Sequence, residues 1–185
     1  MRLTAAWTRL STLVVIGLLL GSLNRPVAAQ DVTTGEATAT VLAGLQVIAF
    51  QDLQFGELLQ GVSKTMPNTD DDSSGIFQIL GAPSRGISIY MAMPAYLSLP
   101  DGSDRLNISF STTDATVDTT VATPSTVVAG DGWIDQNPYN MAAPYVIGTA
   151  GQTNIYLGGK VTPSIDQAAG DYAGDIIVSV AYNGN

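Results

Sequence analysis

Short runs of alternating apolar and polar residues fill most of the chain, and one of them extends from Gly174 to Tyr182. Every second residue of this run is apolar, which is the pattern of a strand with one face in a core. The preceding run, Asn154–Thr162, predicts a neighbouring strand. A strand that closes a β-domain needs a pairing partner, because its free backbone groups would otherwise template aggregation. The expected strand-pairing residues are Ile176, Val178, Val180 and Tyr182.

Similar alternation predicts further strands upstream. They cover Val41–Phe50, Gly75–Gly81, Gly86–Met91, Tyr96–Leu99 and Leu106–Ser111. The first is apolar on both faces and is expected to be covered on both for part of its length. Only four residues separate Gly81 from Gly86, which predicts an antiparallel hairpin between the second and third strands.

Short strands with glycine-rich turns, without a helical pattern, are typical of an all-β domain. The spacing predicts an immunoglobulin-like antiparallel β-sandwich of about seven to nine strands. A jelly roll or a small barrel is the alternative.

The first 29 residues have a different character from the rest. Arg2 and Arg9 precede or flank an apolar run, Leu10–Leu20, and small residues at 27–29 suit a cleavage site. This is the pattern of a secretory signal peptide, and the apolar run is short for a membrane span. We expect cleavage after residue 29 and a single domain over residues 30–185. The protein would then reside in the periplasm, at the cell surface or outside the cell, with no membrane attachment.

Charge and composition exclude several functions. Residues 30–185 hold sixteen acidic and four scattered basic residues, a formal charge of −12, so no basic cluster is available to bind nucleic acid. The chain has no cysteine, so disulfides do not stabilise it. It also has no histidine, which removes the usual general base and the common zinc sites. Asp101, Asp104, Asp131 and Asp135 lie on predicted loops, but their spacing marks no acid pair. We therefore expect no enzyme and no catalytic residue.

Several segments suggest a family. They are Leu53–Gly56, Gly75–Gly81, Ile155–Val161, Gln167–Gly174 and the final strand ending in Tyr182-Asn183. Together they resemble the DUF4402 family of exported bacterial proteins over nearly all of residues 30–185. That family is similar to spore-coat-U-type proteins and to pilins of the archaic chaperone–usher route.

The resemblance implies an immunoglobulin-like subunit that lacks one strand, which a neighbour's N-terminal arm supplies. It also implies self-association, or a pilus chaperone and usher, as partners. The arm available here, Gln30 to about Val41, is short and poor in large apolar residues, and the cysteines common in spore-coat-U-type subunits are absent. A self-complete sandwich is therefore the competing expectation.

Two further features are candidate binding sites. The run Asp70, Asp71 and Asp72 offers carboxylate oxygens of the kind that calcium prefers, although such a run also suits a solvated turn. No other cofactor is expected. The aromatic side chains of Trp133, Tyr139 and Tyr145 stand in a long excursion between strands. They could contact a ligand, whereas the alternative places Trp133 as a plug at the end of the sandwich.

Two functions follow from these features. The first is a non-catalytic structural subunit of a fimbria-like surface appendage, with a role in cell adhesion, that acts by β-strand pairing. The alternative is a monomeric periplasmic or cell-surface module that recognises a host or matrix glycan or protein through the loop around Trp133.

Overall fold

The computed structural model describes residues 39, 41–120, 124, 134–141 and 144–184. The chain divides into two compact units, Met1–Thr40 and Val41–Asn185, and all described residues except Ala39 belong to the second. The expected cleavage position after residue 29 lies outside the described residues. In the described part all regular structure is β, and no helix there is long and apolar enough to cross a bilayer.

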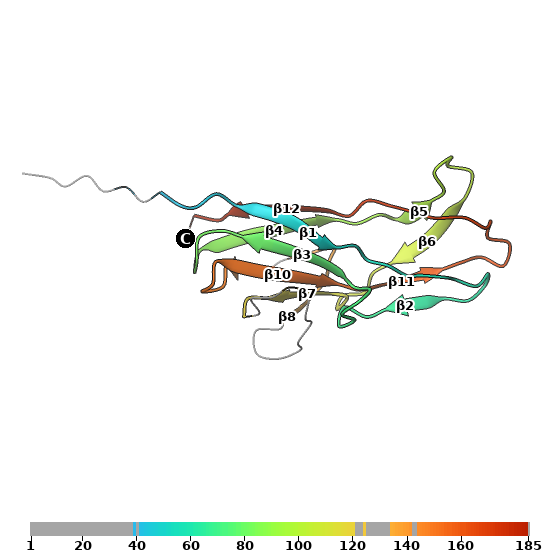
Figure 1. Cartoon of the computed structure of the whole chain (residues 1–185), viewed down its shortest axis with the longest axis horizontal. Coiled ribbons are helices and arrows are strands. Elements are labelled where there is room, and N and C mark those ends of the chain that lie inside the picture. Colours follow the sequence, from blue (N-terminus) through green and yellow to red (C-terminus); the bar gives the residue numbers. More distant parts are fainter. Residues whose placement is uncertain (1–38, 40, 121–123, 125–133, 142–143, 185) are drawn as a thin grey trace, which may run out of the picture. The chain divides into compact units, whose positions relative to one another are not determined.

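Three antiparallel sheets build the unit Val41–Asn185 (Figure 1). One has the strand order β1-β3-β10-β7-β8 and another the order β12-β4-β9. The five strands of the first are β1 (Gln46–Gln51), β3 (Gly75–Leu80), β10 (Gln152–Leu157), β7 (Ala115–Asp118) and β8 (Ile134–Gln136). The three strands of the second are β12 (Ile177–Tyr182), β4 (Gly86–Ala92) and β9 (Tyr145–Val146).

The five-stranded and three-stranded sheets pack face to face, as expected for a sandwich. Phe77 and Ile79 of β3 and Ile155 of β10 share one buried cluster with Ile87 and Ile89 of β4. Cross-strand pairing puts these side chains on the inner faces, since Phe77 lies opposite Ile155 in the ladder. The core therefore comes from apolar positions at a spacing of two, which is the signal that predicted the strands.

A four-stranded sheet extends the sandwich at one end, with the order β2-β11-β6-β5. Its strands are β2 (Lys64–Met66), β11 (Gly159–Thr162), β6 (Arg105–Ser109) and β5 (Tyr96–Ser98). Strand β11 continues β10 after Gly158, and β5 continues β4 after three residues. Because long β-segments are divided in this way, the described residues contain twelve short strands, more than the seven to nine expected. The sheets do not close into a barrel.

The predicted hairpin between Gly75–Gly81 and Gly86–Met91 is wrong. Strand β3 pairs with β1 and β10, whereas β4 pairs with β12 and β9. The connection crosses from one layer to the other, helped by Ser84, which has a positive φ of 57°. The connection is also held by a hydrogen bond to a distant segment, in which the Ser84 N–H donates to the Ile147 carbonyl at 2.9 Å.

The expectation that Val41–Phe50 is covered on both faces is also wrong. Within β1 only Ile48 and Gln51 are half-buried, and the other residues are exposed. A bulge between Ala49 and Gln51 interrupts its ladder with β3. Strand β1 is thus an edge strand of its sheet.

Candidate functional site

Strand β12 pairs with β4, and this pairing contains most of the residues expected to pair. Val178 lies opposite Met91, Val180 opposite Ile89, and Tyr182 opposite Ile87. Ile176 comes directly before the strand. These four side chains pack against the core cluster but stay only half-buried.

The other edge of β12 is open. The Asn183 N–H donates to the Gly86 carbonyl at 3.1 Å, so residue 183 faces β4. In an antiparallel ladder the backbone groups alternate between the two edges. The N–H and C=O groups of Val178, Val180 and Tyr182 therefore point away from β4. Among the described strands, none pairs with this edge.

The strand order shows which position is empty. A constant-type immunoglobulin sandwich has one sheet in the order A-B-E-D and a second sheet made of C, F and G. Strands β1, β3, β10 and β7 reproduce the order A-B-E-D, and β4 and β12 take the places of C and F. Strand G would lie along the open edge of β12, where the described residues place no strand.

The inner faces beside this position lack full cover. Val47 of β1 pairs with Ile79, so its side chain is directed to the inner face, yet it is 36% exposed. The inner-facing residues of β12 are also half-exposed. Strands β1 and β12 lie next to each other at the edges of their two sheets. We call the partly covered strip between them the open seam.

Tyr182 closes one end of the open seam. Its hydroxyl accepts a hydrogen bond from the Ala82 N–H at 2.6 Å and donates one to the Ala43 carbonyl at 2.9 Å. The end of β12 is thereby tied to the segment that leads into β1. Among the described residues, no such hydrogen bond links the other end of the seam, at Ile177, to β1.

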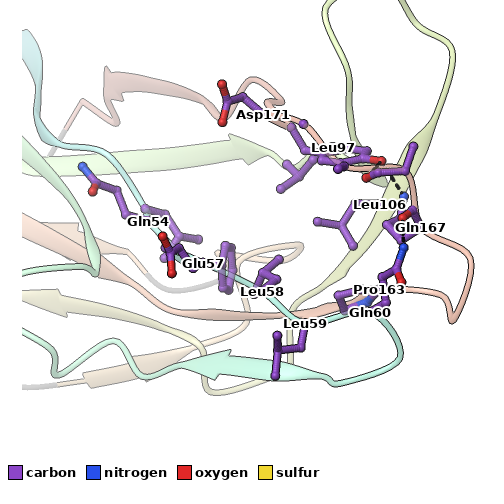
Figure 2. Close-up of a pocket in the computed structure, with 17 residues that line it drawn as sticks. Gln54, Glu57, Leu58, Leu59, Gln60, Leu97, Leu106, Pro163, Gln167 and Asp171 are labelled. Carbon is purple, nitrogen blue, oxygen red and sulfur yellow. Dashed lines mark hydrogen bonds between the residues drawn. The ribbon is translucent and has the colours of Figure 1, made fainter.

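A cavity of about 960 Å³ continues the walls of the seam beyond Ile177. One wall is Leu53–Gln60, which follows β1, and the other is Gln167–Tyr172, which precedes β12. Figure 2 shows Leu58, Leu97 and Leu106 directed toward the cavity between these walls. Its lining combines apolar side chains with polar ones, which suits the side chains of an extended peptide.

Asp104 holds one wall of this cavity in place through hydrogen bonds. Its carboxylate Oδ2 accepts hydrogen bonds from the Tyr172 hydroxyl at 2.6 Å, the Gln167 Nε2 at 2.7 Å and the Ala168 N–H at 2.8 Å. The Tyr172 hydroxyl, followed by the Ala168 and Arg105 amides, holds the pKa of Asp104 below its ordinary value of 3.8.

These hydrogen bonds to the Asp104 carboxylate predict a contribution to folding stability that is lost in acid. Because the folded-state pKa of Asp104 is lowered, its contribution is present above the unfolded value of about 3.8 and is lost as the pH falls through the folded value. We expect Asp104→Asn to lower the urea midpoint at neutral pH. The difference from the parent chain should shrink as the pH falls below the unfolded value of Asp104.

Urea titrations at several pH values measure this effect, with Asp175→Asn at an exposed position as the control. A constant difference between Asp104→Asn and the parent chain at every pH would contradict the role given to the carboxylate.

The aspartate run at 70–72 forms a turn. The Asp70 Oδ1 accepts hydrogen bonds from the Ser73 N–H at 2.8 Å and the Asp72 N–H at 3.1 Å. The described residues contain no group of three or more acidic, His or Cys side chains that could hold a metal ion. Asp70, Asp71 and Asp72 are thus not brought together as the ligand set expected for calcium.

The expected aromatic contact surface is not assembled in the described residues. Tyr145 is buried in the core, so its ring is not available to a surface ligand, which corrects the expectation for this residue. Tyr139 is exposed and packs edge-on against Phe110, with ring centroids 6.0 Å apart. Trp133 lies outside the described residues.

The other candidate carboxylates serve local structure. Asp101 accepts hydrogen bonds from the N–H and hydroxyl of Ser103, and Asp135 accepts one from the Thr116 hydroxyl at 3.0 Å. Asp131 lies outside the described residues. The hydrogen bonds described for Asp101, Asp104 and Asp135 join these carboxylates to different elements and do not bring two of them together.

Sequence reasoning did not identify Val47 or the cavity walls as parts of a site. The run Leu53, Phe55, Leu58 and Leu59 was a usable signal, because it is rich in apolar residues but lacks strand alternation. No protein-family model, curated protein or solved structure matches the chain.

Proposed function

We propose that this protein is an exported, non-catalytic subunit that joins copies of itself into a fimbria-like surface appendage by β-strand pairing. The observation that carries the proposal is the open edge of β12 at the place of strand G. A strand added there would gain backbone hydrogen bonds from Val178, Val180 and Tyr182. Its alternate side chains would enter the seam and set the register.

The donated strand in this proposal is Gln30–Thr40 of another copy. This segment alternates small, β-compatible residues, among them Thr34, Ala37 and Thr38. Large apolar side chains are not required, because Val47, Val178 and Val180 are already half covered. The likeness to the DUF4402 family points to the same mode of assembly.

The open edge of β12 must be protected in the free subunit between export and assembly. An open β-edge aggregates unless it is covered. A periplasmic chaperone that pairs a strand of its own with β12 would cover this edge, and an outer-membrane usher would act after it. The subunit would then reach the cell surface as part of a fibre.

Removal of the donated segment tests the proposal. We expect the full chain, expressed with its leader and purified after export, to give a ladder on SDS gels without boiling. The ladder should be lost on deletion of residues 30–40, while the shortened protein keeps the β-rich circular dichroism spectrum of the parent. A chain in which a Gly/Ser sequence of equal length replaces this segment is the matched control and should also fail to assemble.

A parent protein that stays a monomer would contradict the proposal. That outcome would favour the alternative, a monomeric module that binds glycan or protein through the loop around Trp133. Replacing Trp133 with alanine should then abolish binding to a glycan array.

A further inference from the structure

An exposed apolar cluster stands at one end of the sandwich, next to the cavity. Its members are Leu59, Val62 and Ile165, which are 73%, 54% and 86% exposed. Two loops bring them together, because the Gly61 N–H donates to the Ser164 carbonyl at 2.9 Å. A methyl group on Gly61 would lie 3.1 Å from the Ile165 side chain, so Ile165 covers the turn that holds Leu59 and Val62. We call these three residues the tip cluster.

The opposite end of the unit carries the segment before β1, which begins at Val41. Figure 1 shows the strands leading to the tip cluster, β2 and β11, at one end, and the segment before β1 at the other. Val41 in this segment is 94% exposed. It also immediately follows the proposed donated strand, so any copy that donates the strand must place its Val41 at the point where the strand leaves the seam.

The direction of the donated strand decides at which end of the seam it leaves. Strand G of an immunoglobulin sandwich runs antiparallel to strand F. Strand β12 runs from Ile177 toward Tyr182, at the end near Ala43. An antiparallel guest therefore enters beside Tyr182 with its N-terminus and leaves beside Ile177 with its C-terminus.

The length of the segment sets how far its end reaches beyond β12. The eleven residues 30–40 extend to about 36 Å, of which six residues opposite β12 use about 20 Å. The remaining length of about 16 Å extends past Ile177 along the cavity, whose lining includes Leu59. Val41 of the donating copy would then arrive at Leu59, Val62 and Ile165.

We propose that the tip cluster is the docking surface for the Val41–Leu42 segment of the next copy, which makes a head-to-tail contact between successive subunits. This inference rests on the proposed strand exchange and adds the second surface through which neighbouring copies meet. The contact is heterologous, so it generates an open fibre and not a closed dimer. It explains why strongly exposed apolar residues occur at both ends of the sandwich, where an isolated subunit would expose them to water.

Engineered cysteines test the contact directly, because the chain has no cysteine of its own. The test chain carries Val41→Cys with Ile165→Cys, the most exposed residue of each surface. The matched control carries Val41→Cys with Tyr90→Cys, since Tyr90 is exposed on the outer side of β4. Both full-length chains are exported, oxidised mildly, boiled in SDS without reductant and run beside the cysteine-free parent, which is also run unboiled.

We expect the Val41/Ile165 pair to give a covalent ladder that reductant removes. The yield of multimers should exceed that of the Val41/Tyr90 pair by at least about tenfold, because disulfides form only between closely placed Cα atoms. If the unboiled parent forms a ladder but the two pairs cross-link equally or not at all, the head-to-tail contact is wrong and strand exchange stands. If the parent forms no ladder and neither pair cross-links, both proposals fall.

Discussion

Val180→Pro is expected to abolish assembly while leaving the subunit folded. The backbone N–H of Val180 points to the open edge of β12, so it takes no part in the ladder with β4. Proline is tolerated on an edge strand where its nitrogen faces away from the sheet. Its ring fills the space that a guest strand would occupy, and it removes one donor that the guest needs.

The expected loss can be estimated from the bonds removed. A guest strand opposite Val180 would exchange two backbone hydrogen bonds with this residue. Proline removes the N–H donor and keeps the carbonyl acceptor, so one of these bonds is lost. At roughly 1 kcal/mol net, this loss weakens strand binding by about fivefold, and the clash with the ring weakens it further. Sedimentation of the exported protein and unboiled SDS gels measure the loss of multimers.

Ala181→Pro is the matched control one residue along the strand. The N–H of Ala181 faces β4, so proline there breaks the ladder that holds β12 in the sandwich. We expect a clear fall in the thermal midpoint for Ala181→Pro and a much smaller fall for Val180→Pro. If Val180→Pro folds and assembles as well as the parent, the guest strand does not use this edge.

Local alternation was sufficient to predict several elements of the fold. Leu106, Ile108 and Phe110 are buried while the residues between them are exposed, as their spacing predicted. The partners of a strand could not be predicted in the same way. The connection between β3 and β4 looked like a hairpin, but pairing is decided by residues far along the chain, such as Ile155 opposite Phe77.

In the candidate site, too, local features could be predicted from the sequence, whereas long-range partners could not. Alternation identified which residues of β12 face the core, because that depends on the strand alone. It could not show that the far edge of β12 is open, because that depends on which strands flank it. The bonds from Gln167, Ala168 and Tyr172 to Asp104 also escaped prediction, since more than sixty residues separate Asp104 from each donor.

Gly158→Ala is expected to destabilise the subunit strongly. Gly158 is the point where the chain leaves β10 and enters β11, so it links the five-stranded sheet to the four-stranded one. A Cβ atom at this position would lie 2.4 Å from the Met66 carbonyl oxygen and 2.6 Å from the Asn68 nitrogen. Both neighbours are backbone atoms, which cannot turn aside as a flexible side chain can. The methyl group therefore separates β11 from the end of β2.

Overpacking of this kind costs about 2–3 kcal/mol, which lowers the thermal midpoint by roughly 5–10 °C for a domain of this size. Gly44→Ala is the matched control, because a Cβ atom there meets nothing within 4 Å. It should change stability by no more than about 0.5 kcal/mol. Thermal and urea unfolding of both variants measure the difference, and equal midpoints would show that β2 and β11 separate at little cost. In that case the wall of the cavity would deform easily. The loops of the tip cluster flank β2 and β11, so the cluster would lose the rigid base that a head-to-tail contact requires.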